Sequence, residues 1–179
     1  MPIPFRDLRE DDGLGLAGYL RFITEEDGLG IRGALFVVNG RSEPIDFAFS
    51  RVDVSPSFLW RAGEAKRHAV ASLAAKLFEA CPKAPSLLLA LCGEVHPRVF
   101  TEDLFLDVPI CRLADTDEVP RALNETPENL PGQVHLFWVV KPPEDGSPGR
   151  RLLEALQARD MLNEPFDRAA RGIEEAFRG

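Results

Sequence analysis

The stretch that decides the fold is residues 31–54, IRGALFVVNGRSEPIDFAFSRVDV. Its first half is rich in β-branched and aromatic side chains and runs into Asn39-Gly40, the dipeptide that most readily supplies the two positive-φ residues of a type I′ hairpin turn. In its second half apolar and polar side chains alternate, and the phase of that alternation reverses at Ser50 and Arg51. We therefore expect two antiparallel strands joined by a tight turn, with a β-bulge where the phase reverses.

Outward from this hairpin, the hydrophobic pattern predicts one strand before it and a long helix after it. Residues 17–24 alternate and are followed by an acidic turn, so they complete a three-stranded antiparallel meander. Between residues 63 and 81 apolar side chains recur at intervals of three and four, which indicates one amphipathic helix ending before Pro82.

The rest of the chain alternates between predicted strands and predicted helices. We expect strands at 86–91, 104–113 and 134–140, a surface connection at 115–133 with one helical turn at 118–123, and a C-terminal helical segment at 142–179 that is N-capped by Ser147 and broken at Pro165. Residues 1–16 read as an arm or loop, and the length of 179 residues favours one globular domain over 1–179.

The predicted class is mixed α/β, and its element order, βββ-α-β-(β)-β-α, resembles the ribonuclease H-like architecture. The resemblance lies in the order alone, since no motif of that superfamily matches residue by residue. It implies two divalent metals held by carboxylates from the first strand, the fourth strand and a late helix. The first strand offers only Arg21 as a charged residue, while Glu94 follows the strand at 86–91, and Glu154 or Asp160 could face it from the last helix. The expected metal cage is therefore incomplete.

Three residues are candidates for catalysis: Asp46, Glu94 and His96. Cys92 and His96 stand near the end of a predicted parallel strand, where α/β sheets place ligands, and could serve as nucleophile and base. The alternative is that Cys92 continues an apolar run and that His96 begins a loop leaving the sheet.

No motif predicts a metal or a cofactor. His68 and His135 have no partner at metal-ligand spacing, and the glycine-containing stretches lack the spacing of a phosphate-binding loop. Cys81, Cys92 and Cys111 are an odd number without CxxC spacing, which is typical of reduced core thiols. We expect no metal site and no cofactor.

A second group of residues is suited to binding a partner. The bulky trio Phe58-Leu59-Trp60 precedes the long helix, either as a lid on the core or as an exposed anchor for another protein. Arg61, Lys66 and Arg67 contribute to a basic helix face beside it. Phe58, Trp60, Arg61, Lys66 and Arg67 are therefore the predicted partner-binding residues.

Charge and composition narrow the class of partner. With 21 basic and 29 acidic side chains the net charge is −8, which repels polyanions, so nucleic acid is disfavoured as a partner but stays open. No apolar stretch long enough to span a bilayer and no signal peptide is found, which indicates a cytoplasmic protein without a membrane partner.

We expect a non-catalytic interaction or accessory protein that binds a protein partner or a second copy of itself, and the balance is against an enzyme. The alternatives are a metal-dependent nuclease or phosphodiesterase on a ribonuclease H-like fold, and a small-molecule binding module.

Overall fold

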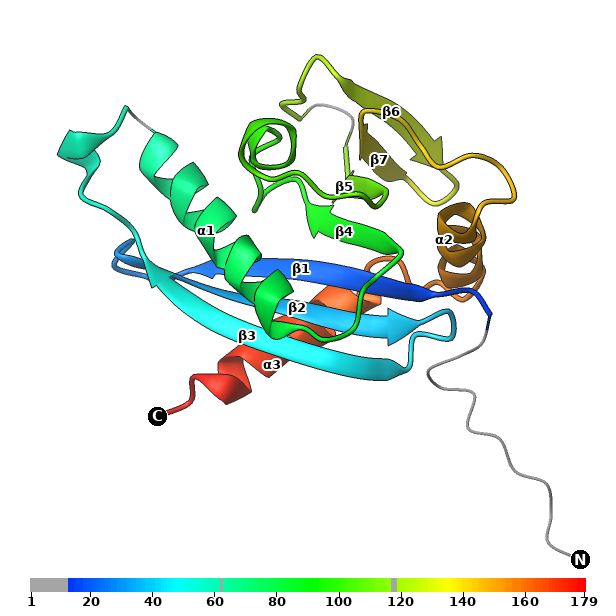
Figure 1. The fold of residues 1–179 in the computed structure, drawn as a ribbon, viewed down its shortest axis with the longest axis horizontal. Coiled ribbons are helices and arrows are strands. Elements are labelled where there is room, and N and C mark those ends of the chain that lie inside the picture. The colour runs from blue at the N-terminus through cyan, green and yellow to red at the C-terminus, as the bar shows by residue number, and fades with distance from the viewer. Residues whose placement is uncertain (1–12, 62, 117–118) are drawn as a thin grey trace, which may run out of the picture.

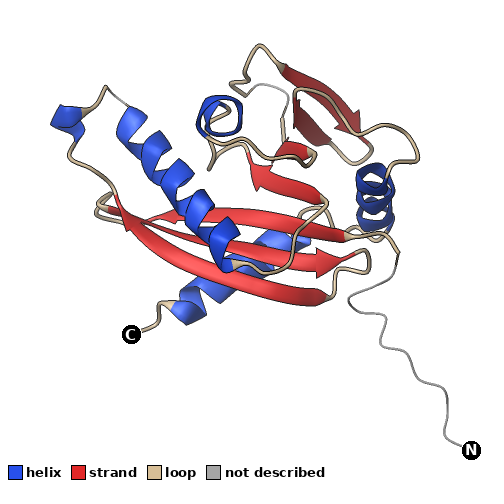
Figure 2. Ribbon diagram, in the orientation of Figure 1, coloured by secondary structure: helices blue, strands red, loops and turns tan. Residues whose placement is uncertain are grey.

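The computed structural model describes residues 13–61, 63–116 and 119–179, and in these a seven-stranded mixed sheet carries helices on both faces (Figures 1 and 2). The strand order across the sheet is β3-β2-β1-β4-β5-β7-β6. Most of the expected N-terminal arm, residues 1–12, lies outside the described residues.

The elements follow one another along the chain in the order the sequence pattern predicts, with three additions. The strands are β1 (Leu16–Thr24), β2 (Gly30–Asn39), β3 (Pro44–Asp53), β4 (Leu87–Leu91), β5 (Ile110–Ala114), β6 (Glu125–Leu130) and β7 (Val134–Val139). The helices are α1 (Glu64–Ala80), α2 (Pro148–Ala158) and α3 (Glu164–Ala176), with a 3₁₀ turn η1 (Ser57–Leu59) and a π-helical turn η2 (Val99–Asp103). The additions are η1, η2 and β6.

Strands β1, β2 and β3 form the expected antiparallel meander, and β4 then pairs with β1 in parallel. Strand β5 is parallel to β4, and β7 and β6 extend the sheet in antiparallel fashion. An antiparallel hairpin pair beside parallel strands joined by a helical crossover is the arrangement implied by the ribonuclease H-like resemblance.

The two faces of the sheet are covered by different helices. Helix α1 packs over β2 and β3 on one face, where Leu35, Leu73 and Leu77 are fully buried. Helices α2 and α3 pack on the other face, where Leu152 and Phe166 are buried (Figure 1). The predicted N-cap and break are confirmed: the Ser147 hydroxyl accepts a hydrogen bond from the Arg150 N–H at the start of α2, and Pro165 lies in the first turn of a second helix, α3.

The β2–β3 hairpin is confirmed, but its predicted turn and bulge are wrong. The loop is longer than a two-residue turn because the Asn39 side-chain oxygen accepts the backbone N–H groups of Arg41 and Glu43, and the positive φ of 61° falls on Ser42. The register shift lies beside Val37 and Val38, at the start of β3. The apolar side chains of β3 change from one face of the strand to the other along its length because α3 covers one face and α1 covers the other.

Two predictions for the second half of the chain need correction. Strand β5 occupies only the end of the expected strand at 104–113, because the chain first makes the η2 turn and then a loop through Pro109, which lacks a backbone donor for the sheet. The connection at 115–133 contains strand β6, an edge strand that tolerates Pro127. The predicted turn at 118–123 begins outside the described residues, and residues 119–123 form no helix. In the described part of the chain, no helix is long and apolar enough to cross a membrane.

Candidate functional site

The carboxyl ends of β1, β4 and β5 meet at one edge of the sheet, because these three neighbouring strands run parallel. This is the edge at which open α/β sheets bind ligands. A cavity of about 450 Å³ opens there. It is lined by the end of β4 and the turn after it, the end of β5 and the loop after it, and the residue before α3: Leu91, Cys92, Gly93, Glu94, Leu113, Ala114, Asp115, Thr116, Val119 and Asn163.

An ion pair between Arg21 and Glu94 ties β1 to the turn after β4 at this edge. The Arg21 guanidinium donates through Nη1 to Glu94 Oε1, and the backbone N–H of Phe22 donates to Glu94 Oε2 at 2.8 Å. The side chains of Arg21 and Glu94 are 21% and 16% exposed, so solvent reaches both from one side. Both oxygens of Glu94 are therefore engaged by β1.

Burial dominates the acid–base behaviour of Glu94 and leaves part of Arg21 unsatisfied. Burial raises the pKa of the Glu94 carboxyl, against the lowering effect of the Phe22 N–H and the Arg21 guanidinium. The Arg21 Nε–H is buried without a hydrogen-bond partner. A buried unpaired donor costs roughly 1–3 kcal/mol.

A buried hub of hydrogen bonds fixes the two loops that flank the cavity. Arg112 of β5 makes a bidentate pair with Glu125, at 2.7 and 2.9 Å, and its other donors reach the carbonyls of Val95 and Pro120. Glu125 also accepts the backbone N–H of Ala122. The hub thus joins the turn after β4 to the segment that leads into β6.

The structure separates the candidate catalytic residue Asp46 from Glu94 and His96, which lie two positions apart in the chain. Asp46 of β3 pairs with Val37 of β2, which in turn pairs with Gly18 of β1. Asp46 is therefore level with the beginning of β1, whereas Glu94 contacts the end of β1. Asp46 instead accepts a hydrogen bond from the Cys81 thiol at 3.5 Å. His96 is exposed, and its Nδ1 accepts the Arg98 backbone N–H.

Cys92 lines the cavity but is poorly suited to act as a nucleophile. Burial raises the pKa of its thiol to about 11, so the thiolate is scarce near neutral pH. No hydrogen bond joins Cys92 to His96 among the residues that the structure describes. The nucleophile and base interpretation of this pair therefore has no geometric support.

Sequence reasoning missed Asp115. It follows β5 directly and lines the same cavity as Glu94, which follows β4. Its position immediately after an apolar stretch was a usable indication, but the sequence pattern did not show that this strand pairs with β4. Glu154 is exposed on α2, whose first turn approaches Ser86 at the opposite end of β4.

The predicted partner-binding residues divide into exposed and buried ones. Phe58 and Trp60 are 84% and 40% exposed, which rules out a lid on the core, and Arg61 and Lys66 are exposed beside them. Arg67 is buried, because it forms ion pairs with Glu64, Glu102 and Asp103. Arg67 is therefore not available to a partner.

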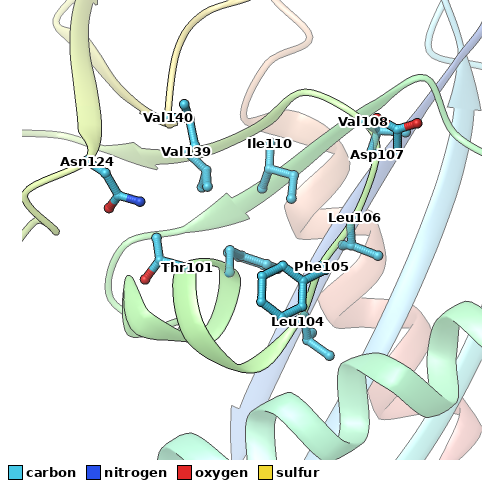
Figure 3. A pocket seen from close by; sticks show the side chains of 11 residues that line it. Thr101, Leu104, Phe105, Leu106, Asp107, Val108, Ile110, Asn124, Val139 and Val140 are labelled. Atoms are coloured by element: carbon cyan, nitrogen blue, oxygen red, sulfur yellow. The ribbon is translucent and has the colours of Figure 1, made fainter.

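A second cavity, of about 510 Å³, lies between η2 and the amino end of β5. Figure 3 shows apolar side chains such as Phe105, Ile110 and Val139 around it, with Thr101 and Asn124 at one side. Asp107 is the one charged residue among those that line it. This cavity is therefore less charged than the one at the edge, which Glu94 and Asp115 line.

Comparison with known proteins shows the fold. No protein-family model matches the sequence, and no curated protein is similar to it. The structure is similar to endonuclease V of Streptomyces avermitilis, with a TM-score of 0.58 and 14% identity over 92% of this chain and 82% of that one. It also matches endonuclease V of Bacillus subtilis, with a TM-score of 0.49 and 16% identity over 86% of this chain and 84% of that one. The seven-stranded mixed α/β sheet is ribonuclease H-like, as expected.

This comparison overturns the expected function. The prediction of a non-catalytic interaction or accessory protein acting through protein contacts is wrong, because the structure resembles a nuclease. The alternative of a metal-dependent nuclease or phosphodiesterase on a ribonuclease H-like fold agrees better with the fold.

Proposed function

We propose that this protein binds nucleic acid at the edge formed by the carboxyl ends of β1, β4 and β5, with a backbone phosphate against Arg21. The observation that carries the proposal is the guanidinium of Arg21, which stands partly exposed at the ligand-binding edge of the sheet with Nη2 not used by Glu94. The fold shared with endonuclease V supports nucleic acid as the class of ligand.

The chemistry of Arg21 suits a phosphate. A guanidinium presents several N–H donors in a plane and matches two phosphate oxygens at once. Glu94 uses Nη1 and Nε is buried, which leaves Nη2 for a ligand that arrives from solvent. Because Glu94 fixes the position of the group, little side-chain entropy is lost when an anion binds. A net charge of −8 weakens the long-range attraction between the protein and nucleic acid. Because salt screens distant charges, a direct contact between a phosphate and the Arg21 guanidinium depends mainly on these two groups.

The metals implied by the ribonuclease H-like fold do not fit the residues at this edge. Arg21 lies on β1 where a carboxylate is needed, and both Glu94 oxygens are already engaged. Within residues 13–61, 63–116 and 119–179, no three His, Cys, Asp or Glu side chains form a group that could hold a metal ion. We therefore derive no hydrolytic step through a metal.

Phosphodiester hydrolysis is a second candidate function, because Glu94 and Asp115 line one cavity from adjacent parallel strands. It is tested by incubating labelled DNA and RNA with the protein and either Mg²⁺ or Mn²⁺. Hydrolysis at this edge requires that product forms and that Glu94→Gln abolishes it. Intact substrate under conditions in which the nucleic acid is bound would rule the second candidate out.

The test of binding is fluorescence anisotropy with labelled oligonucleotides at several salt concentrations. Arg21→Gln should weaken binding roughly tenfold, since a hydrogen bond to a charged group contributes about 1.5–3 kcal/mol, and should lower the salt slope by about one. Arg21→Lys should restore part of the salt slope. The matched control is Arg151→Gln, an exposed charge on α2 at the far end of β4. Equal affinities of the wild type, Arg21→Gln and Arg151→Gln would refute the assignment.

A further inference from the structure

The segment before α1 displays an aromatic surface that the candidate site does not use. Phe58, Leu59 and Trp60 are 84%, 65% and 40% exposed, although apolar side chains of this size are usually buried. The Trp60 ring packs against the His68 imidazole, with centroids 4.4 Å apart. The indole is thus held from one side by α1 while a large part of it stays open to solvent.

Positive charge surrounds this aromatic surface. Arg61 and Lys66 are exposed, and neither forms an ion pair with any residue that the structure describes. The nearest acid on α1, Glu64, is neutralised by ion pairs with Arg67 and Arg98. The surface therefore carries unpaired positive charge in a protein whose net charge is negative.

The aromatic surface and the candidate site lie toward the same side of the molecule (Figure 1). Burial raises the pKa of Glu94, and the positive charge of Lys66 is among the influences that lower it. Figure 1 agrees, because β1 and β4 point toward the side of the molecule on which η1 and the first turn of α1 lie. Arg21 shares the face of β1 with Tyr19, which packs on α3, whereas α1 covers the opposite face, so a nucleic acid strand that contacts both sites passes around the carboxyl ends of β1 and β4.

We infer that Phe58, Trp60, Arg61 and Lys66 form a stacking platform for single-stranded nucleic acid, in addition to the phosphate site at Arg21. Aromatic rings flanked by basic side chains bind single strands because every base has a π-face and every nucleotide a phosphate. A duplex keeps its base faces stacked inside, so this surface selects single strands. The inference rests on the proposed function and specifies the class of nucleic acid.

The protein carries its own reporter for this inference. Trp138, the second tryptophan, is fully buried, and its Nε1–H donates to Glu128 at 2.7 Å. Intrinsic tryptophan fluorescence that responds to a ligand at the surface therefore comes from Trp60. Titrating the full chain with an oligothymidylate should quench that emission, while a hairpin duplex of equal length should quench it far less.

Variants separate stacking from folding. Trp60→Ala should weaken single-strand binding roughly tenfold, with duplex binding little changed, and Trp60→Phe should keep most of the affinity because a ring remains. The matched control is Phe105→Ala, which removes a ring that is 90% exposed beside the second cavity and should leave binding unchanged.

The outcomes distinguish this inference from the proposed function. If anisotropy detects no binding of oligothymidylate or duplex, both are overturned. If the oligothymidylate binds but Trp60 emission and the Trp60→Ala affinity do not change, the proposed function stands and the platform is refuted. The platform would also be refuted if the oligothymidylate still quenched the fluorescence of Trp60→Ala but no longer quenched that of Phe105→Ala.

Discussion

Replacing Arg112 with methionine should be among the most damaging single changes in this chain. Its side chain is 1% exposed and that of Glu125 is fully buried. The replacement leaves the Glu125 carboxylate with the Ala122 N–H as its remaining donor and deprives two backbone carbonyls of theirs. Breaking a buried ion pair on one side costs about 3–5 kcal/mol, because an uncompensated charge stays in the interior.

A double-mutant cycle measured by urea unfolding tests this reasoning. Arg112→Met and Glu125→Leu should each lose about 3–5 kcal/mol of unfolding free energy, whereas the double variant should recover much of that loss. The matched control is Arg178→Met, which breaks an exposed pair with Glu175 and should cost less than about 1 kcal/mol. A free energy of unfolding for Arg112→Met within about 1 kcal/mol of the wild-type value would refute the stabilising role of the hub.

Three shorter predictions follow from individual side chains. Because burial raises the pKa of Cys92 to about 11, roughly one Cys92 thiol in a thousand is ionised at pH 8. In a Cys81→Ser background, alkylation of Cys92 should therefore be slow and should accelerate steeply with pH. Alkylation at the rate of an ordinary cysteine would contradict this prediction. Burial raises the pKa of Glu128, but hydrogen bonds from a guanidinium and an indole outweigh that effect and lower the pKa below 4.5. The stability that the Glu128 carboxylate contributes is therefore present above pH 4.5 and is lost as the pH falls through the lowered pKa. In unfolding measurements, Glu128→Gln should reduce this loss of stability at acid pH. Gly172→Val should destabilise the fold by about 1–3 kcal/mol in thermal unfolding, since a Cβ there would lie 2.6 Å from the Phe47 ring; an unchanged melting temperature would show that α3 can move away from β3.

Local pattern was sufficient for most of the elements. The helix at 63–81 and the capped helix after Ser147 were predictable because spacing and capping are properties of neighbouring residues. Strand β6 was not, because its residues, ETPENL, have the composition of a loop and become a strand only by pairing with β7 at the sheet edge. The bulge of β3 was misplaced because the change of phase comes from helices on opposite faces.

The candidate site was less predictable than the fold. Glu94 was found because it follows an evident central strand, but its partner Arg21 is separated from it by 73 positions in the sequence, and only the pairing of β1 with β4 joins them. Asp46 was selected as an acid on a strand, and strand register places it at the wrong end. Exposure of Trp60 depends on how η1 leaves the sheet, which no local pattern encodes.

The central claim is that nucleic acid lies at the carboxyl ends of β1, β4 and β5. Hydrogen–deuterium exchange of the full chain, with and without a saturating oligothymidylate, locates the contact directly. We predict slower exchange in the peptides that cover residues 91–98 and 113–116, with no change at 104–110 beside the second cavity. Protection confined to 104–110, or no protection by an oligonucleotide that is demonstrably bound, would contradict the account.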